Sequence, residues 1–307
     1  MSSKLVKAEP ITGAGAVQIV EVGPRDGLQN EKKILSSDLR IELIESLVRT
    51  GLTRIEAGSF VSPKRVPQMA ESAEVFRGLQ ARPGVTYSAL VANKRGLETA
   101  MSAGVREIAV FAAASETFSA KNINCSIADS VLRYRELASE ALRQGIRVRG
   151  YVSCVLGCPY EAYVSPGSVL SVAGSLFDMG CFEVSLGDTI GSGTPETTTE
   201  LLRTLIGPLP PERLAVHFHD TSGRAIENIG VALGFGIRVI DASIAGLGGC
   251  PFAPGSPGNV ATERVVSALH ARRFETGIDE PALAVVAKWV ADMLEKRRAC
   301  PAQATGE

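Results

Sequence analysis

Two histidines that stand two residues apart are the first feature of this sequence with chemical meaning. His217 and His219 lie in the segment HFHD, directly after the apolar run 214–216, and the chain of 307 residues has only three histidines. Because side chains alternate across a β-strand, this spacing directs both imidazoles to the same face. Two neutral imidazoles on one face favour a divalent metal site, since each supplies a nitrogen ligand.

The elements that must position this pair follow from the hydrophobic pattern. Apolar, β-rich runs predict eight strands, near residues 17–22, 54–56, 86–91, 107–112, 148–153, 182–186, 214–217 and 239–243. The segments between them have apolar residues at helical spacing. Five of these segments end in a glycine typical of a helix C-cap, at Gly51, Gly104, Gly145, Gly180 and Gly236. Eight strand–helix alternations in about 260 residues predict an α/β fold of the (β/α)8 TIM barrel type.

The main alternative is a doubly wound open sheet, but the G-x-G-x-x-G turn expected after its first strand is missing. No Pro/Gly/Ser-rich linker divides the chain. We therefore expect residues 1–270 to form the barrel. Residues 271–307 are expected to add C-terminal helices and a tail to the same domain.

Barrel enzymes carry their reactive residues at the C-terminal ends of the strands. The polar residues at those positions are Arg25, Asp26, Glu56, Ser59, Ser185, Asp188, His217 and His219, with Cys250 and Asn259 in a glycine-rich loop after the last strand. Strands seven, eight and one are neighbours in a closed barrel, which brings Asp26, both histidines and Asn259 within reach of one ion. A carboxylate, two imidazoles and an amide suit Mg²⁺ or Mn²⁺, and the open positions favour aldol-type cleavage or condensation, with hydrolysis behind.

Each candidate also has a structural interpretation that the residues alone leave open. Asp26 can cap the turn after Pro24 with Arg25 as its ion-pair partner, and Asp188 can cap the following helix. Glu56 can be a buried structural carboxylate. Cys250 can be inert, or it can act as an acid or base if the glycine-rich loop closes over the metal.

The overall composition excludes several classes of partner. The chain has 32 Lys+Arg against 33 Asp+Glu, so nothing favours nucleic acid or an acidic membrane as partner. The N-terminus lacks a secretory or transit signal, which predicts a cytoplasmic protein whose six cysteines are thiols. Cys154 and Cys158 have no second cysteine pair at the spacing of a structural zinc site.

Longer motifs give the chain a resemblance to one enzyme family. Residues 21–31 read EVGPRDGLQNE, residues 55–69 IEAGSFVSPKRVPQM, residues 215–225 AVHFHDTSGRA and residues 245–263 AGLGGCPFAPGSPGNVATE. With the segments 113–127, 149–162 and 183–195, they resemble the 3-hydroxy-3-methylglutaryl-CoA lyase family, a branch of the metal-dependent lyase and synthase barrels. The resemblance runs from Val17 to about Ala268.

This resemblance implies an acyl-CoA thioester as substrate, Mg²⁺ or Mn²⁺ as cofactor, and a homodimer by analogy. It implies that the metal is bound by Asp26, His217, His219 and Asn259. It also implies a catalytic group of Arg25, Cys250, His217, Glu56 and Asp188, with Arg25, Gln29, Ser59 and Ser185 at the substrate. The implied reaction is retro-Claisen cleavage of the C2–C3 bond of hydroxymethylglutaryl-CoA, giving acetoacetate and acetyl-CoA.

Two departures from the family pattern bear on the choice of substrate. Arg264 stands where the family usually has an acidic residue, and Pro257 lies in the glycine-rich loop. The alternative substrates are therefore a longer 3-hydroxy-3-alkylglutaryl-CoA or citramalyl-CoA. A Claisen-condensing synthase of the same superfamily would need a longer chain, and a non-catalytic barrel would not need the complete set of site residues.

Overall fold

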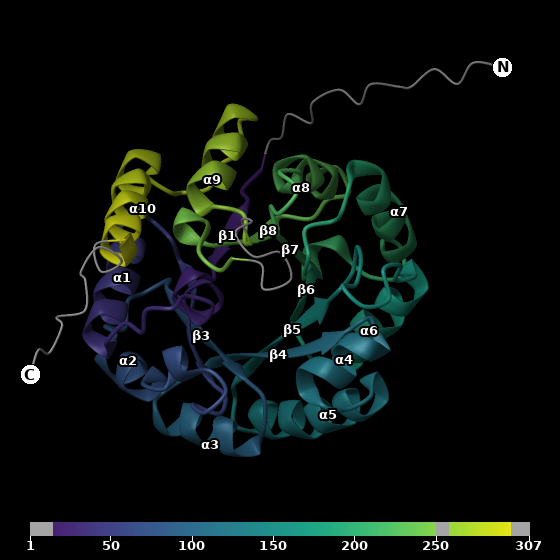
Figure 1. The fold of residues 1–307 in the computed structure, drawn as a ribbon, viewed down its shortest axis with the longest axis horizontal. Helices are drawn as coiled ribbons and strands as arrows, with labels where there is room; N and C mark the ends of the chain where they lie inside the picture. The colour runs from purple at the N-terminus through teal and green to yellow at the C-terminus, as the bar shows by residue number, and fades with distance from the viewer. Residues whose placement is uncertain (1–14, 250–257, 296–307) are drawn as a thin grey trace, which may run out of the picture.

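Eight parallel strands close into a barrel, with helices arranged in a ring around it (Figure 1). The computed structural model describes residues 15–249 and 258–295. The strands are β1 (Gln18–Glu21), β2 (Arg54–Phe60), β3 (Thr86–Val91), β4 (Glu107–Ala113), β5 (Arg147–Ser153), β6 (Glu183–Asp188), β7 (Leu214–Phe218) and β8 (Val239–Ala242). They follow one another in chain order, and β8 pairs with β1. The predicted barrel is confirmed, and all eight predicted strands are present.

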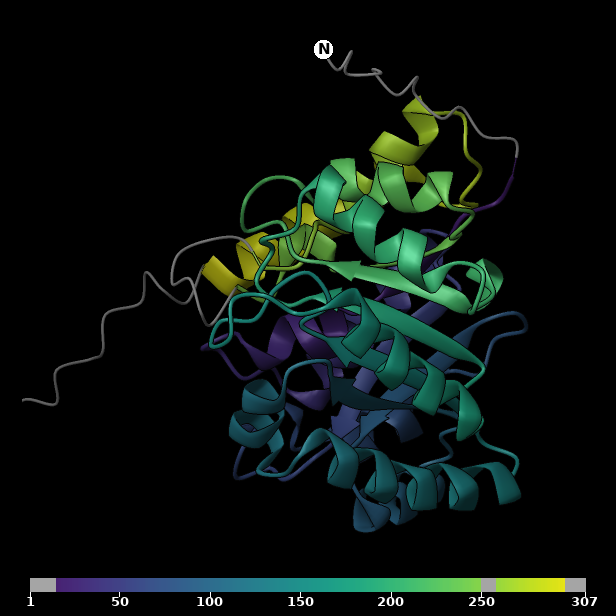
Figure 2. The ribbon, with the colours of Figure 1, turned by 90° about the vertical axis from the view of Figure 1, so that its right-hand side faces the viewer.

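The helices are α1 (Ser37–Arg49), α2 (Ser72–Gly78), α3 (Lys94–Ser102), α4 (Glu116–Ile123), α5 (Ile127–Arg143), α6 (Pro166–Asp178), α7 (Pro195–Leu205), α8 (Ala225–Gly234), α9 (Thr262–Ala271) and α10 (Glu280–Glu295). Helices α7 and α8 run along the outside of the strands (Figure 2). The five glycines predicted to end helices all have positive φ, from +71° at Gly145 to +99° at Gly180, a region that side chains disfavour. Among the described residues, no helix has the length and apolar character needed to span a membrane.

The C-terminal helices complete the ring. Helix α10 packs against both α1 and α9, and Figure 1 shows it beside α1. The division of the chain near residue 270 stays a prediction, but α9 and α10 both contact the short helix η4 (Ile244–Gly246), which follows β8. They therefore support the segment from which the glycine-rich loop leaves the barrel.

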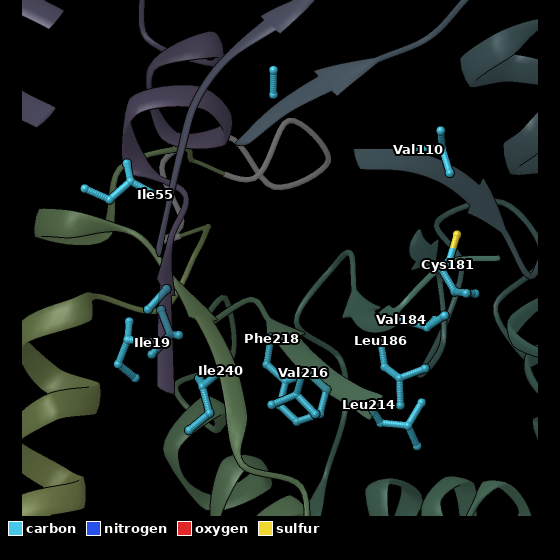
Figure 3. Close-up of a cluster of buried hydrophobic side chains, with 14 of the residues drawn as sticks. Ile19, Ile55, Val110, Cys181, Val184, Leu186, Leu214, Val216, Phe218 and Ile240 are labelled. Atoms are coloured by element: carbon cyan, nitrogen blue, oxygen red, sulfur yellow. The ribbon is translucent and has the colours of Figure 1, made fainter. Parts of the chain in front are cut away.

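Alternate residues of each strand serve two different cores. Outward-facing side chains such as Ile19, Val184, Val216 and Ile240 pack in a large apolar layer between strands and helices (Figure 3). Inward-facing side chains form only small apolar clusters, for example Val20 with Ala215. The space left inside the barrel is occupied largely by charged residues.

These charged residues form a continuous column of buried ion pairs. Near the N-terminal ends of the strands, Arg54 holds Glu183 through two contacts of 2.9 and 3.0 Å. Arg149 is the next member of the column. Its Nε donates to Glu183 Oε1 at 2.6 Å, and its Nη2 donates to Asp241 Oδ1 at 2.8 Å. The column thus rises from the base of the barrel to the strand ends, where the predicted site residues lie.

Candidate metal centre and active site

A tight turn after β1 presents the first two site residues. The five residues of η1 (Gly23–Gly27) form a single π-type turn in which the amides of Arg25, Asp26 and Gly27 all donate to the carbonyl of Val22, at 3.1, 2.7 and 3.2 Å. Glycine is required at its end, because a Cβ on Gly27 would lie 2.7 Å from both Leu247 Cβ and Ser243 Oγ. The turn is therefore pressed against the segment that follows β8.

Asp26, His217 and His219 form a group that could hold a metal ion. One ligand atom from each lies within 4.8 Å of the others, and His217 Nε2 is 3.8 Å from Asp26 Oδ2. Asn259 joins them, since its Nδ2 donates to Asp26 Oδ2 at 2.8 Å and to the carbonyl of Leu247 at 3.0 Å. The structure thus brings together all four residues predicted as ligands, from the turn after β1, the end of β7 and the segments that follow β7 and β8.

The electrostatics of this group suit a cation. Burial lowers the pKa of His219 to about 4, with a further contribution from His217, so His219 is a neutral imidazole. Burial alone would raise the pKa of Asp26, but Arg25 and the two histidines outweigh it and hold that pKa at about 2. In the described part of the chain, the buried Nδ1 atoms of both histidines have no hydrogen-bond partner of good geometry. An ionised carboxylate beside two imidazole rings is a ligand set that fits a divalent ion.

Arg25 lies between two carboxylates at the edge of this group. Its Nη1 is 2.5 Å from Asp26 Oδ1, and its Nε and Nη2 are 2.6 and 2.5 Å from Glu56 Oε2. Both Arg25 and Glu56 are buried. Burial raises the pKa of Glu56, although Arg25 opposes this by favouring the ionised form. Tyr151 also donates to Glu56 Oε2, at 3.3 Å, so one oxygen of Glu56 anchors two neighbours.

The remaining predicted residues divide between the cavity and its support. Gln29 lines the cavity and donates to Asp26 Oδ1 at 3.2 Å, whereas Ser59 is buried and its hydroxyl has no partner among the described residues. Ser185 donates to Asp241 Oδ2 at 2.9 Å beneath the site. The Asp188 carboxylate accepts from the amides of residues 192 and 193 at 3.2 and 2.9 Å, and burial raises its pKa to about 6. Asp188 therefore holds the loop after β6, and its catalytic role stays a prediction.

Cys250 and Pro257 lie outside the described residues, so their predicted roles stay predictions. Arg264, at the start of α9, pairs with Asp220, the residue that follows His219. The amide of Asp220 in turn donates to the carbonyl of Gly258 at 2.7 Å. The unusual arginine thus ties α9 to the two segments that carry His219 and Asn259.

A cavity of about 690 Å³ opens over this group. Arg25, Asp26, Gln29, His217 and His219 contribute to its lining. Further lining residues include the apolar side chains of Val61, Leu90, Phe111 and Phe118 and the polar side chains of Arg65, Asn93, Asn122 and Arg133. The space is large enough for an extended substrate with both apolar and polar parts.

Comparison with known proteins identifies the family. Residues 16–290 match the model of the HMGL-like family. This chain belongs to the HMGL-like family. A Pseudomonas aeruginosa relative, 3-hydroxy-3-isohexenylglutaryl-CoA/hydroxymethylglutaryl-CoA lyase, is 54% identical over 280 residues, covering 91% of this chain and 93% of the relative. Hydroxymethylglutaryl-CoA lyase of Pseudomonas mevalonii is 55% identical over 271 residues, covering 88% and 90%.

Solved structures of HMGL-like proteins have the same architecture. The hydroxymethylglutaryl-CoA lyase of Pseudomonas aeruginosa superposes with a TM-score of 0.89 at 54% identity, covering 91% of this chain and 93% of that one. An HMG-CoA lyase from Acinetobacter baumannii in complex with coenzyme A and 3-methylmalate gives a TM-score of 0.86 at 32% identity, covering 95% and 97%. The family resemblance and the lyase class expected from the sequence are confirmed.

Sequence reasoning missed three buried residues that connect to the predicted site residues, one in the wall of the cavity and two below it. Tyr151, Arg149 and Asp241 are all buried and connect to Glu56, Ser185 and each other. A signal was present, because Arg149 and Asp241 are charged residues inside otherwise apolar strands, where a parallel barrel has no solvent to receive them. Such residues must point into the barrel and find partners there.

Proposed function

We propose that this protein cleaves 3-hydroxy-3-methylglutaryl-CoA into acetoacetate and acetyl-CoA, using a divalent cation, Mg²⁺ or Mn²⁺, held by Asp26, His217, His219 and Asn259. One observation carries the proposal. Three ligand atoms lie within 4.8 Å of one another beside a buried arginine, in a chain about 55% identical to hydroxymethylglutaryl-CoA lyases. A bound cation supplies a Lewis acid that lowers the pKa of a substrate hydroxyl and orients the oxygens it contacts.

Arg25 is the group that stabilises the charge produced by the cleavage. When the C2–C3 bond breaks, its electron pair moves to C2 and the thioester fragment becomes an enolate with a negative oxygen. A guanidinium at that oxygen lowers the energy of the transition state because it is fixed before charge develops. The three short contacts of Arg25 with Asp26 and Glu56 provide this fixation. Arg25 also lines the cavity, and the two carboxylates leave that side of the guanidinium open to the substrate.

Two proton transfers complete the reaction. The C3 hydroxyl loses its proton as the C3 oxygen becomes the ketone of acetoacetate, and the enolate carbon gains a proton to give acetyl-CoA. His217 lines the cavity and takes part in the first transfer as a ligand, because the cation that it would help to hold would make the hydroxyl acidic enough to release its proton to water. Cys250 is the acid that we assign to the second transfer, on the strength of its place in the family motif.

The cavity lining supports an acyl-CoA thioester. Arg65 and Arg133 bring positive charge to the wall, and Asn93 and Asn122 bring amide groups that can bind the peptide-like part of a pantetheine arm. A longer 3-hydroxy-3-alkylglutaryl-CoA is the second candidate substrate. The apolar wall formed by Val61, Leu90, Phe111 and Phe118 could receive an alkyl chain.

The test is the release of acetyl-CoA by chelator-treated protein with and without added Mg²⁺ or Mn²⁺, using three substrates: hydroxymethylglutaryl-CoA, a longer 3-alkyl analogue and citramalyl-CoA. We expect metal-dependent cleavage of the first, and faster cleavage of another would reassign the substrate while keeping the mechanism. The His219→Ala variant should lose activity and Mn²⁺ binding. His270→Ala is the matched control, because His270 contacts Glu280 and Thr276 far from the site. Full activity of His219→Ala would overturn the metal site. The homodimer and the cytoplasmic location stay predictions.

A further inference from the structure

Asp241 lies inside the barrel below the four proposed metal ligands. It contacts the ring nitrogen of His217 that faces away from Asp26. Its Oδ2 is 3.4 Å from His217 Nδ1, while the other ring nitrogen, Nε2, is 3.8 Å from Asp26 Oδ2. His217 is therefore placed between two carboxylates, one on each ring nitrogen. Asp26 belongs to the proposed ligands, whereas Asp241 is too deep in the barrel to be one and is fully buried.

The position of Asp241 is fixed by more than this contact. Arg149 donates to both of its oxygens, with Nη1 3.0 Å from Oδ2 and Nη2 2.8 Å from Oδ1. Ser185 adds a third hydrogen bond, to Oδ2, at 2.9 Å. All three hydrogen bonds are donated to Asp241, and two of them come from a buried guanidinium, the partner that an ionised carboxylate requires. Asp241 is thus an ionised carboxylate, which can only accept hydrogen bonds.

An acceptor at Nδ1 has a consequence for the proton of His217. A neutral imidazole carries one N–H, and the nitrogen with the nearer carboxylate carries it, which is Nδ1, at 3.4 Å from Asp241 Oδ2 against 3.8 Å between Nε2 and Asp26 Oδ2. The separation of 3.4 Å is longer than a typical hydrogen bond, but such contacts are often loose in ligand-free sites and tighten in the complex.

We propose that Asp241 is a positioning residue that holds His217 in the tautomer with hydrogen on Nδ1, so that the lone pair of Nε2 faces the metal. This inference rests on the proposed metal site. A carboxylate behind a ligating histidine fixes the ring orientation and raises the basicity of the ligand nitrogen. Arg149 and Ser185 hold the carboxylate in place from below, so the buried column of ion pairs ends at a metal ligand.

The tautomer can be measured directly in the unaltered, metal-free protein. The chain has three histidines, so ¹H–¹⁵N spectra of histidine-labelled protein can be assigned with His219→Ala and His270→Ala. At pH 8 we expect the spectrum of His217 to show hydrogen on Nδ1. A proton on Nε2 would overturn the inference, and this result does not depend on whether metal binds.

The second test is Mn²⁺ affinity, measured by titration calorimetry on the Asp241→Asn variant. The oxygen of the new amide is expected to face Arg149, which leaves its NH₂ group toward His217 Nδ1 and favours the wrong tautomer. We expect Mn²⁺ binding to weaken by about 10- to 100-fold. Glu107→Gln is the matched control, because it also removes a buried carboxylate inside the barrel, but one that pairs with Arg54 and Arg147 and forms no ion pair with His217 among the described residues.

The two experiments separate this inference from the proposed function. Equal Mn²⁺ affinity of Asp241→Asn and the unaltered protein would overturn the role of Asp241 and leave the metal site standing. Failure of the unaltered protein to bind Mn²⁺ would overturn the metal site. The NMR spectrum of the metal-free protein would still show whether Asp241 holds the proton of His217 on Nδ1. An equal loss of affinity in Glu107→Gln would point to a general disturbance of the barrel interior and would also overturn the specific role.

Discussion

Glu21 joins the segments on both sides of the active site, and its replacement by glutamine gives a sharp test. Its Oε1 accepts from the amides of Gly23 and Ile244, both at 2.8 Å, and its Oε2 accepts from the Thr262 hydroxyl at 2.6 Å. These partners lie after β1, after β8 and at the start of α9. In Glu21→Gln the amide oxygen can keep the first two hydrogen bonds, while the NH₂ group can donate to Thr262.

Burial raises the pKa of Glu21 from 4.5 to about 7, although its hydrogen bonds favour the ionised form. Below pH 4.5 the carboxyl is protonated in both the folded and the unfolded chain, and its full contribution to stability is present. Between pH 4.5 and 7 the unfolded chain releases the proton first, so stability is lost as the pH rises through the folded pKa. A pKa difference of this size corresponds to about 3 kcal/mol. Glutamine does not titrate and escapes this loss.

The assay is urea unfolding of the unaltered protein and of Glu21→Gln at intervals between pH 4.5 and 8. The free energy of unfolding of the unaltered protein, taken relative to the variant, should fall by about 3 kcal/mol across this range. Glu212→Gln removes an exposed carboxylate and serves as the control that should show no such trend. A difference between Glu21→Gln and the unaltered protein that does not change with pH would refute the reasoning.

Three further variants test the site and its support. Glu56→Gln removes the charge that fixes Arg25 and should lower kcat by about 100-fold in steady-state assays without loss of Mn²⁺ binding; an unchanged kcat would contradict the role of Arg25. Gly248 has φ +95° and a Cβ there would lie 2.7 Å from Asn259 Nδ2, so Gly248→Ala should weaken Mn²⁺ binding by about 10-fold in calorimetry. Arg149→Met removes the arginine partner of the buried Asp241, while Glu183 keeps Arg54, and should destabilise the protein by about 3–5 kcal/mol in urea unfolding; a smaller loss would mean that water reaches the column.

Much of the fold and site could be predicted because both depend on simple periodicities. Apolar strands alternating with amphipathic helices are typical of a barrel, and a barrel places strand ends together. His217 and His219 could be placed on one face by their spacing, and Asp26 and Asn259 could be added because the first and last strands meet. Strand β2 was predicted too short, since its second half contains Gly58, Ser59 and a bulge rather than an apolar run.

The roles of Asp188, Ser185 and Asp241 could not be assigned from the sequence, because they depend on which way a buried polar side chain turns. Asp188 turns toward the amides of the following loop, while Ser185 turns toward Asp241. The direction is decided by partners from other strands, and register between strands is set by the closed barrel as a whole. Sequence spacing along a single strand carries no information about those partners.

The column of charges inside the barrel is better explained by position than by stability. Each buried ion must lose its hydration, so apolar residues of similar volume are often as stable as a buried ion pair or more so. A chain of contacts nevertheless runs from the base of the barrel to His217, through Arg54, Glu183, Arg149 and Asp241 in that order. A paired buried charge cannot move without leaving its partner unsatisfied, which costs several kcal/mol. On the proposed metal site, the column therefore gives rigid support to His217, the proposed ligand at its upper end, and fixes the orientation and the proton of that ring.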